Sequence, residues 1–242
     1  MLLSPAKAKD FVNAGRSRKR LSGIAAGALR RGILRIFSRI ESAASGTGYV
    51  TGTFDGLKKI LSGSDTEYTS EVDISTSALM DSNYNAYLDE LDGFISKLAE
   101  KPDILLMNNE LLTKTRAAAR RAGFYERSVD GFGRTVEKYN GIPMMDVGQY
   151  YNGTKTIDVI ETTTPSATAY GETAIYAVKL GLNAFHGISV DGSKMVHTYL
   201  PDLNAPGAVK KGEVEMLAGA VLKNSKMAGV LKGIKVKPKT AG

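Results

Sequence analysis

The chain contains no cysteine, so neither a disulfide framework nor a thiolate metal site can form. This absence fits a protein made inside cells and argues weakly against a small secreted one. The apolar runs fall far short of the roughly 20 residues that span a bilayer. The N-terminus also has no apolar stretch long enough for a signal peptide. We therefore expect a soluble protein that does not contact a membrane.

Histidine is also scarce, since His186 and His197 are the only two. They flank an Asp191-Gly192 turn pair, and a hairpin there would bring them together, but two imidazoles fall short of the three or four ligands of a zinc site. No HExxH or GxSxG pattern occurs, and the stretch at residues 130–134 lacks the spacing of a phosphate-binding loop. The sequence therefore predicts no catalytic residue, no metal site, no cofactor and no small-molecule substrate. We do not expect an enzyme.

The net charge of +7 is concentrated at one end of the chain. Residues 1–40 carry ten basic side chains and one acid, about +9, and the other 202 residues sum to about −2. Apolar residues recur among the basic ones over residues 11–41 at a spacing that favours an amphipathic helix, although three glycines weaken it. Such a helix contacts nucleic acid, contacts an anionic membrane, or simply exposes a solvated face. The candidate residues for nucleic-acid or subunit contact are Arg16, Arg18, Lys19, Arg20, Arg30, Arg31, Arg35 and Arg39.

Residues 42–53 are small and polar, which is typical of a linker, and a mixed α+β body follows. Its longest predicted helix covers residues 77–100, where apolar residues recur every three or four positions. Ser75, Thr76 or Ser77 can cap its start, and Lys101-Pro102 ends it. At about 1.5 Å per residue it would be roughly 36 Å long. A helix of this length would act as a spine.

The stretch from Ile104 to Asp146 has the clearest local signals. Residues 104–107 form an apolar run typical of a buried strand. Asn108 or Asn109 can cap the next helix, and Gly123 is suited to its C-terminal turn. Residues 134–143 predict a hairpin around Asn140-Gly141. None of these segments contains reactive groups.

The remainder of the chain is rich in predicted strands and loops. Strands are expected at 156–160, 174–180, 214–222 and 233–236, and a short helix at 225–231. A hairpin is expected between 187–190 and 195–200, turning at Asp191-Gly192.

The order of these signals resembles the major capsid proteins of tailed bacteriophages with the Hong Kong 97-type fold. The matching segments are FDGLKKIL at 54–61, KPDILLMNNELL at 101–112, RAAARRAG at 116–123, TVEKYNGIPMMDVG at 135–148, TAIYAVKLG at 173–181 and the segment 214–236. The resemblance implies an α+β fold with a basic segment and linker at 1–53. It further implies a peripheral domain with the spine helix, from 54–107 and 210–242, and a central axial domain of mixed α/β structure at 108–209.

The resemblance also implies a function. Such subunits self-assemble into hexameric and pentameric rings of an icosahedral shell that encloses double-stranded DNA. We therefore expect a virion protein made in the bacterial cytoplasm, with copies of itself and packaged DNA as partners. Family members carry a long N-terminal arm and an extended loop before the FDGL-like segment, and the 53 residues that precede it here do not resemble them. We expect a shortened or remnant prophage protein, or one with a different start.

Three alternatives remain open from the sequence. An encapsulin-like compartment would have the same fold and an enzyme cargo in place of a genome. A DNA-binding protein would use the basic helix on an unrelated α+β body. An enzyme with a site that the sequence does not reveal is the third.

Overall fold

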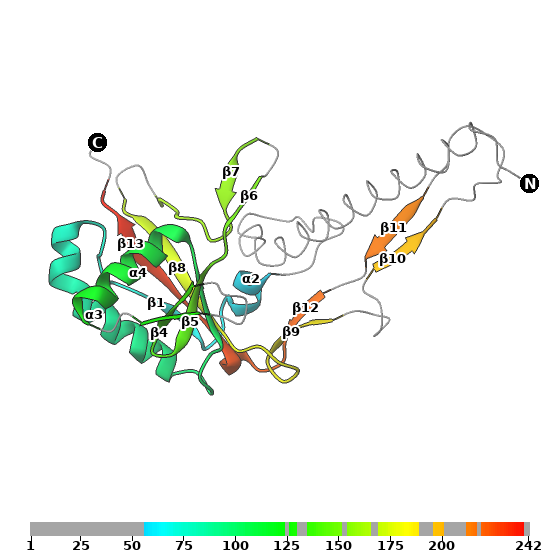
Figure 1. Cartoon of the computed structure of the whole chain (residues 1–242), viewed down its shortest axis with the longest axis horizontal. Helices are drawn as coiled ribbons and strands as arrows, with labels where there is room; N and C mark the ends of the chain where they lie inside the picture. The colour runs from blue at the N-terminus through cyan, green and yellow to red at the C-terminus, as the bar shows by residue number, and fades with distance from the viewer. Residues whose placement is uncertain are drawn as a thin grey trace, which may run out of the picture.

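The computed structural model describes residues 56–123, 126–129, 135–151, 154–165, 169–188, 196–200, 212–216 and 219–239 (Figure 1). The basic segment with its eight candidate contact residues, the linker at 42–53 and the stretch at 130–134 lie outside these ranges. The predictions made for those three segments therefore remain predictions.

A seven-stranded mixed sheet forms the body (Figure 1). Its order is β1-β13-β8-β2-β5-β4-β3, with parallel pairing only for β1 with β13 and β2 with β5. The strands are β1 Glu67–Thr69, β2 Ile104–Met107, β3 Glu126–Val129, β4 Thr135–Tyr139, β5 Ile142–Asp146, β8 Gly171–Val178 and β13 Ala228–Lys237. The sheet has strands from both sides of the boundary that the sequence suggests at residue 107, and the division into domains stays a prediction.

Helices cover both faces of this sheet (Figure 1). The helices α3, Ser77–Ser96, and α4, Asn109–Arg121, share one core with the first face, and α2, Leu57–Leu61, shares a second core with the other. Strand β2 shows why both cores form. Leu105 and Met107 belong to the core under α3 and α4, and Leu106 between them belongs to the core under α2, because successive strand residues point to opposite faces.

The local predictions around α4 are confirmed. Strand β2 has the predicted bounds, and the Asn108 side chain caps α4 by accepting from the backbone N–H of Leu111 at 2.9 Å. Gly123 follows the helix with φ of 75°, which suits a glycine. Asn140 and Gly141 have φ of 49° and 73°, typical of the tight turn expected between β4 and β5.

Helix α3 begins where predicted, with Thr76 as its cap, but it ends at Ser96 and not at residue 100. The N–H groups of Lys97 and Leu98 bond to carbonyls three residues back, which tightens the last turn. The N–H of Ala99 then bonds to the carbonyl of Lys226 at 3.0 Å instead of continuing the helix. At 20 residues the helix is about 30 Å long. Its role as a spine stays a prediction.

Four short strands make a projecting arm, and their pairing contradicts the predicted hairpin. Strand β9, Phe185–Ile188, pairs with β12, Gly219–Leu222, and β10, Val196–Tyr199, pairs with β11, Glu213–Met216. The four therefore pair in the order of one interrupted hairpin. Pairing with the distant returning chain replaces the predicted pairing of the two segments with each other, and Asp191-Gly192 lies outside the described residues. We call residues 185–222 the arm (Figure 1).

Other predicted elements in this half also change. The strand expected at 214–222 is divided into β11 and β12. The helix expected at 225–231 is only a 3-10 turn, η1 Ser225–Met227, since β13 starts at Ala228 and includes the strand expected at 233–236. Residues such as Val230 and Leu231 are buried in that strand, so tertiary packing prevails over local helical spacing. A small ribbon of β6, Gln149–Tyr151, and β7, Thr156–Asp158, completes the described structure.

Candidate assembly surface

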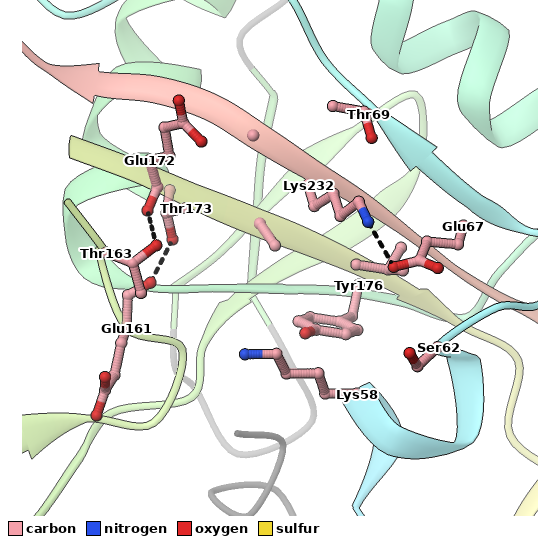
Figure 2. A pocket seen from close by; sticks show the side chains of 13 residues that line it. Lys58, Ser62, Glu67, Thr69, Glu161, Thr163, Glu172, Thr173, Tyr176 and Lys232 are labelled. Carbon is pink, nitrogen blue, oxygen red and sulfur yellow. Dashed lines mark hydrogen bonds and ion pairs between the residues drawn. The ribbon is translucent and has the colours of Figure 1, made fainter. Parts of the chain in front are cut away.

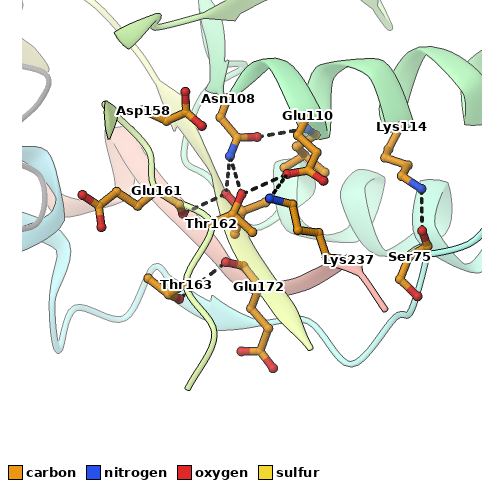
Figure 3. A network of polar contacts seen from close by, with 12 residues as sticks. Ser75, Asn108, Glu110, Lys114, Asp158, Glu161, Thr162, Thr163, Glu172 and Lys237 are labelled. Atoms are coloured by element: carbon orange, nitrogen blue, oxygen red, sulfur yellow. Dashed lines mark hydrogen bonds and ion pairs between the residues drawn. The ribbon is translucent and has the colours of Figure 1, made fainter. Parts of the chain in front are cut away.

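A polar network that extends from the buried Asn108 to the surface lies at the C-terminal end of β2 (Figure 3). The Asn108 Nδ2, which has two N–H donors, lies 3.0 to 3.1 Å from three acceptors: the carbonyl of Ile160 and the hydroxyls of Thr162 and Thr173. The Glu110 carboxylate accepts from the Thr162 hydroxyl and pairs with Lys237, both at 3.3 Å. These groups satisfy one another and fix the loop before β8 to the start of α4. That arrangement is typical of a structural contact.

A cavity of about 280 Å³ lies on the α2 side of the sheet, between α2, β1, β8, β13 and the loop at 161–163 (Figure 2). Its main charge contact joins Lys232 Nζ to Glu67 Oε1 at 2.8 Å. The hydrogen bond from Lys232, and a second from the Gly63 N–H, hold the pKa of the Glu67 carboxyl below its usual range. The cavity is slightly smaller than most ligand pockets. No histidine lines it, and we assign it no ligand.

Two buried tyrosines, Tyr87 on α3 and Tyr139 on β4, stay neutral. Burial raises the pKa of the Tyr87 phenol, whose hydroxyl lies 2.7 Å from the Thr115 hydroxyl. Burial also raises the pKa of Tyr139, and its hydrogen bond to Asp92 at 2.9 Å raises it further. Both phenols therefore stay protonated near neutral pH, and both side chains contribute to packing.

The two histidines lie on different ribbons. His186 is opposite Val221 in the β9–β12 pair, and His197 is opposite Glu215 in the β10–β11 pair. Because β9 pairs with β12 and β10 with β11, the hairpin that was expected to bring the two histidines together is wrong. Within the described ranges, no group of three or more His, Asp or Glu is placed to hold a metal ion. None of the helices described is long and apolar enough to cross a membrane.

Exposed apolar side chains gather at the arm. Seven large apolar side chains are prominently exposed among the described residues, and five of them fall between residues 180 and 200. They lie in the connection before the arm, on its strands and directly after β10, with exposed fractions of 48 to 76%: Leu180, Leu182, Ile188, Tyr199 and Leu200. We call these five the apolar arm surface. Large exposed apolar side chains that recur in one part of a molecule are a feature of interaction sites.

The geometry of the arm explains this exposure. Phe185 and Leu222 face each other across β9 and β12 and pack on the core under α2. Ile188 lies on the opposite side of the ribbon, over Gly219, and is 48% exposed. Two paired strands are marginal on their own in water, because they cannot bury their own faces. The arm therefore presents apolar groups that this subunit does not cover.

No motif in the sequence predicts this surface, and the charge pattern points to the basic segment instead. A signal was present in Leu180-Gly-Leu182 and in Tyr199-Leu200-Pro201, where large apolar residues stand beside turn formers. Apolar residues at such positions do not fit either a buried strand or a polar loop. The pairing that places them on one arm joins segments about 30 residues apart, and no local pattern predicts it.

The sequence matches no protein-family model and no curated protein. The structure does have a counterpart in the cryo-EM structure of the holo-SrpI encapsulin complex from Synechococcus elongatus PCC 7942. The TM-score is 0.61 at 14% sequence identity, over 93% of this chain and 68% of the encapsulin chain. The fold is Hong Kong 97-like. The predicted fold class is thus confirmed at this level, and at 14% identity the likeness speaks to the fold alone.

A second solved structure is a crystal structure assigned as a prophage capsid protein from E. coli CFT073. Its TM-score is 0.49 at 14% identity, over 98% of this chain and 72% of the other.

Proposed function

We propose that this chain is a shell-forming subunit whose copies associate into a closed particle. The apolar arm surface carries the proposal, because its five large apolar side chains, at the base of a two-stranded arm and along it, are left exposed by this subunit and would be covered by a partner. The Hong Kong 97-like fold supports a second copy of the chain as that partner, since the encapsulin with this fold is a shell protein. In this proposal the chain acts through its surfaces and catalyses no reaction.

The finer form of the proposal is a phage or prophage capsid subunit. Rings of six and five subunits would build an icosahedral virion shell around double-stranded DNA. The concentration of about nine positive charges in residues 1–40 supports a DNA partner, because phosphate neutralisation by Lys and Arg is the main source of non-specific DNA affinity. The same segment can alternatively contact the mildly acidic body of a neighbouring subunit.

The second candidate is an encapsulin-type shell with protein cargo, which the similarity to the SrpI encapsulin supports. The content of purified particles separates the two. Nuclease-protected DNA inside the particles favours the capsid, and a co-purifying protein with no protected DNA favours the encapsulin. The fold does not favour the isolated DNA-binding module that the sequence left open.

The arm surface provides the test of the shell proposal. In the double variant Leu182→Asp and Ile188→Asp, two apolar contacts become charges that an interface would have to desolvate at high cost. We expect the wild-type chain to give large particles by mass photometry and negative-stain microscopy, and the double variant to give small species.

Met145→Asp is the matched control, since Met145 is 51% exposed on β5, outside the arm. We expect it to assemble like the wild type. A double variant that forms the same particles as the wild type would contradict the proposal.

A further inference from the structure

The arm joins the body through two short segments that we call the arm root. One, at 179–184, connects β8 to β9, and the other, at 223–227, connects β12 to β13. Backbone hydrogen bonds join the two segments of the root to each other. The N–H of Lys179 donates to the carbonyl of Met227 at 2.9 Å, and the N–H of Lys223 donates to that of Ala184 at 3.3 Å. The two connections therefore move together.

The loop after α3 holds both sides of this root. On one side the N–H of Ala99 donates to the carbonyl of Lys226 at 3.0 Å. On the other side the N–H of Asp103 donates to the carbonyl of Val178 at 3.0 Å. This loop is anchored to the core by Leu98, which is buried. The loop thus contacts the root at Lys226 and the last residue of β8, directly before the root, at Val178.

The Asp103 carboxylate adds a third contact at the point where the chain turns into the arm. Its Oδ2 accepts from the N–H of Leu180 at 2.9 Å, and its Oδ1 accepts from Lys179 Nζ at 3.1 Å. Glu100 is a second acid beside the same ammonium, at 3.8 Å. Gly181 follows at once with φ of 150°, a conformation that L side chains rarely adopt. The chain direction therefore changes immediately after the amide that Asp103 holds.

Leu180, whose amide donates to Asp103, also belongs to the apolar arm surface. The Leu180 amide is held by Asp103, and its side chain is 52% exposed beside Leu182. A backbone N–H bonded to a carboxylate makes a stronger contact than a neutral pair. The contact therefore orients both the start of the arm and the first apolar side chain on it.

We propose that Asp103 is a latch that fixes the direction in which the arm leaves the body, and with it the angle at which copies associate. The second half of this inference rests on the proposed function, and the first half does not. A shell built from one sequence closes at a defined size only if each subunit presents its contacts at a restricted angle. Loosening the latch would leave the subunit folded and widen the range of particle sizes.

The first readout is hydrogen exchange at the Leu180 amide. It is measured by mass spectrometry on the full chain, below the concentration at which copies associate. Asp103→Ala removes both acceptors, so we expect Leu180 to exchange about tenfold faster or more. Asp103→Asn keeps an acceptor for the Leu180 N–H and should restore most of the protection. Asp81→Ala is the control, because it removes the carboxylate that pairs with Arg121 on the body, outside the root.

The second readout is the distribution of particle diameters at higher concentration. We expect a broader distribution for Asp103→Ala and the wild-type distribution for Asp103→Asn and Asp81→Ala. Unchanged exchange at Leu180 in Asp103→Ala would overturn the latch, independently of the particle diameters. Faster exchange with unchanged diameters would overturn its link to assembly. A wild-type chain that forms no particles would overturn the proposed function, and the exchange data would still decide the latch.

Discussion

Asn108 shows at the scale of one residue how this chain uses a polar side chain for structure. It is 1% exposed, caps α4 through its oxygen and directs its two N–H donors at three acceptors around the loop before β8. The cap was predictable, because Asn before an apolar periodic segment is a common helix start. The contacts of the nitrogen were not, because Ile160, Thr162 and Thr173 lie 52 to 65 residues away in sequence.

Asn108→Ala should destabilise the subunit strongly. The substitution removes a helix cap, which costs about 1 kcal/mol, and leaves buried acceptors without their donor, at about 1–3 kcal/mol. We expect the free energy of unfolding, measured by urea denaturation of dissociated subunits, to fall by about 2–4 kcal/mol.

Asn224→Ala is the matched control for this change. Asn224 also caps a turn with its side chain, but its contact to the Lys226 N–H is exposed. We expect a loss of about 1 kcal/mol or less there. Equal losses for the two variants would show that the Asn108 network adds nothing beyond a cap.

At the scale of elements, predictions from local signals held and those that depended on pairing failed. Strand β2, helix α4 and the Asn140-Gly141 turn are encoded by residues next to one another, and the structure has them where expected. The arm depends on the pairing of β9 with β12, two strands that are distant in sequence. The Asp191-Gly192 pair lies closer to β9 and predicted a hairpin with residues 195–200 instead. The end of α3 failed for the same reason, because the Ala99 amide bonds to Lys226, far along the chain.

The arm root should loosen in acid. The hydrogen bond from the Leu180 N–H, followed by that from Lys179, holds the pKa of the Asp103 carboxyl below its ordinary value of 3.8. A group whose pKa is lower in the folded state stabilises it above the unfolded pKa and loses that contribution as pH falls through the folded pKa. The latch is therefore fully present at neutral pH and is lost only below about pH 3.8.

Hydrogen exchange at Leu180, corrected for the intrinsic pH dependence of exchange, measures this loss. We expect wild-type protection to be constant from neutral pH to about pH 4 and then to fall. Asp103→Asn has no carboxyl to protonate there, so its protection should not change over this range. A wild-type protection that declines between pH 7 and pH 5 would contradict the assignment of the latch to Asp103.

At the scale of the whole molecule, the positive charge is concentrated in one part of the sequence. The residues that carry about +9 are at 1–40, and the remaining 202 residues sum to about −2. If the basic segment contacts packaged DNA, deleting residues 1–40 should weaken DNA binding and flatten the dependence of log affinity on log salt, because fewer phosphate counterions are released. Fluorescence anisotropy with duplex DNA at several salt concentrations measures both. An unchanged slope would exclude this segment as the DNA contact.

Copies of this chain should build a closed shell. Mass photometry of the wild-type chain, with cryo-EM of the same sample, tests this proposal. We expect hollow particles of many subunits with the arms at contacts between copies. A strict monomer at every concentration, with the apolar arm surface still exposed to solvent, would contradict it.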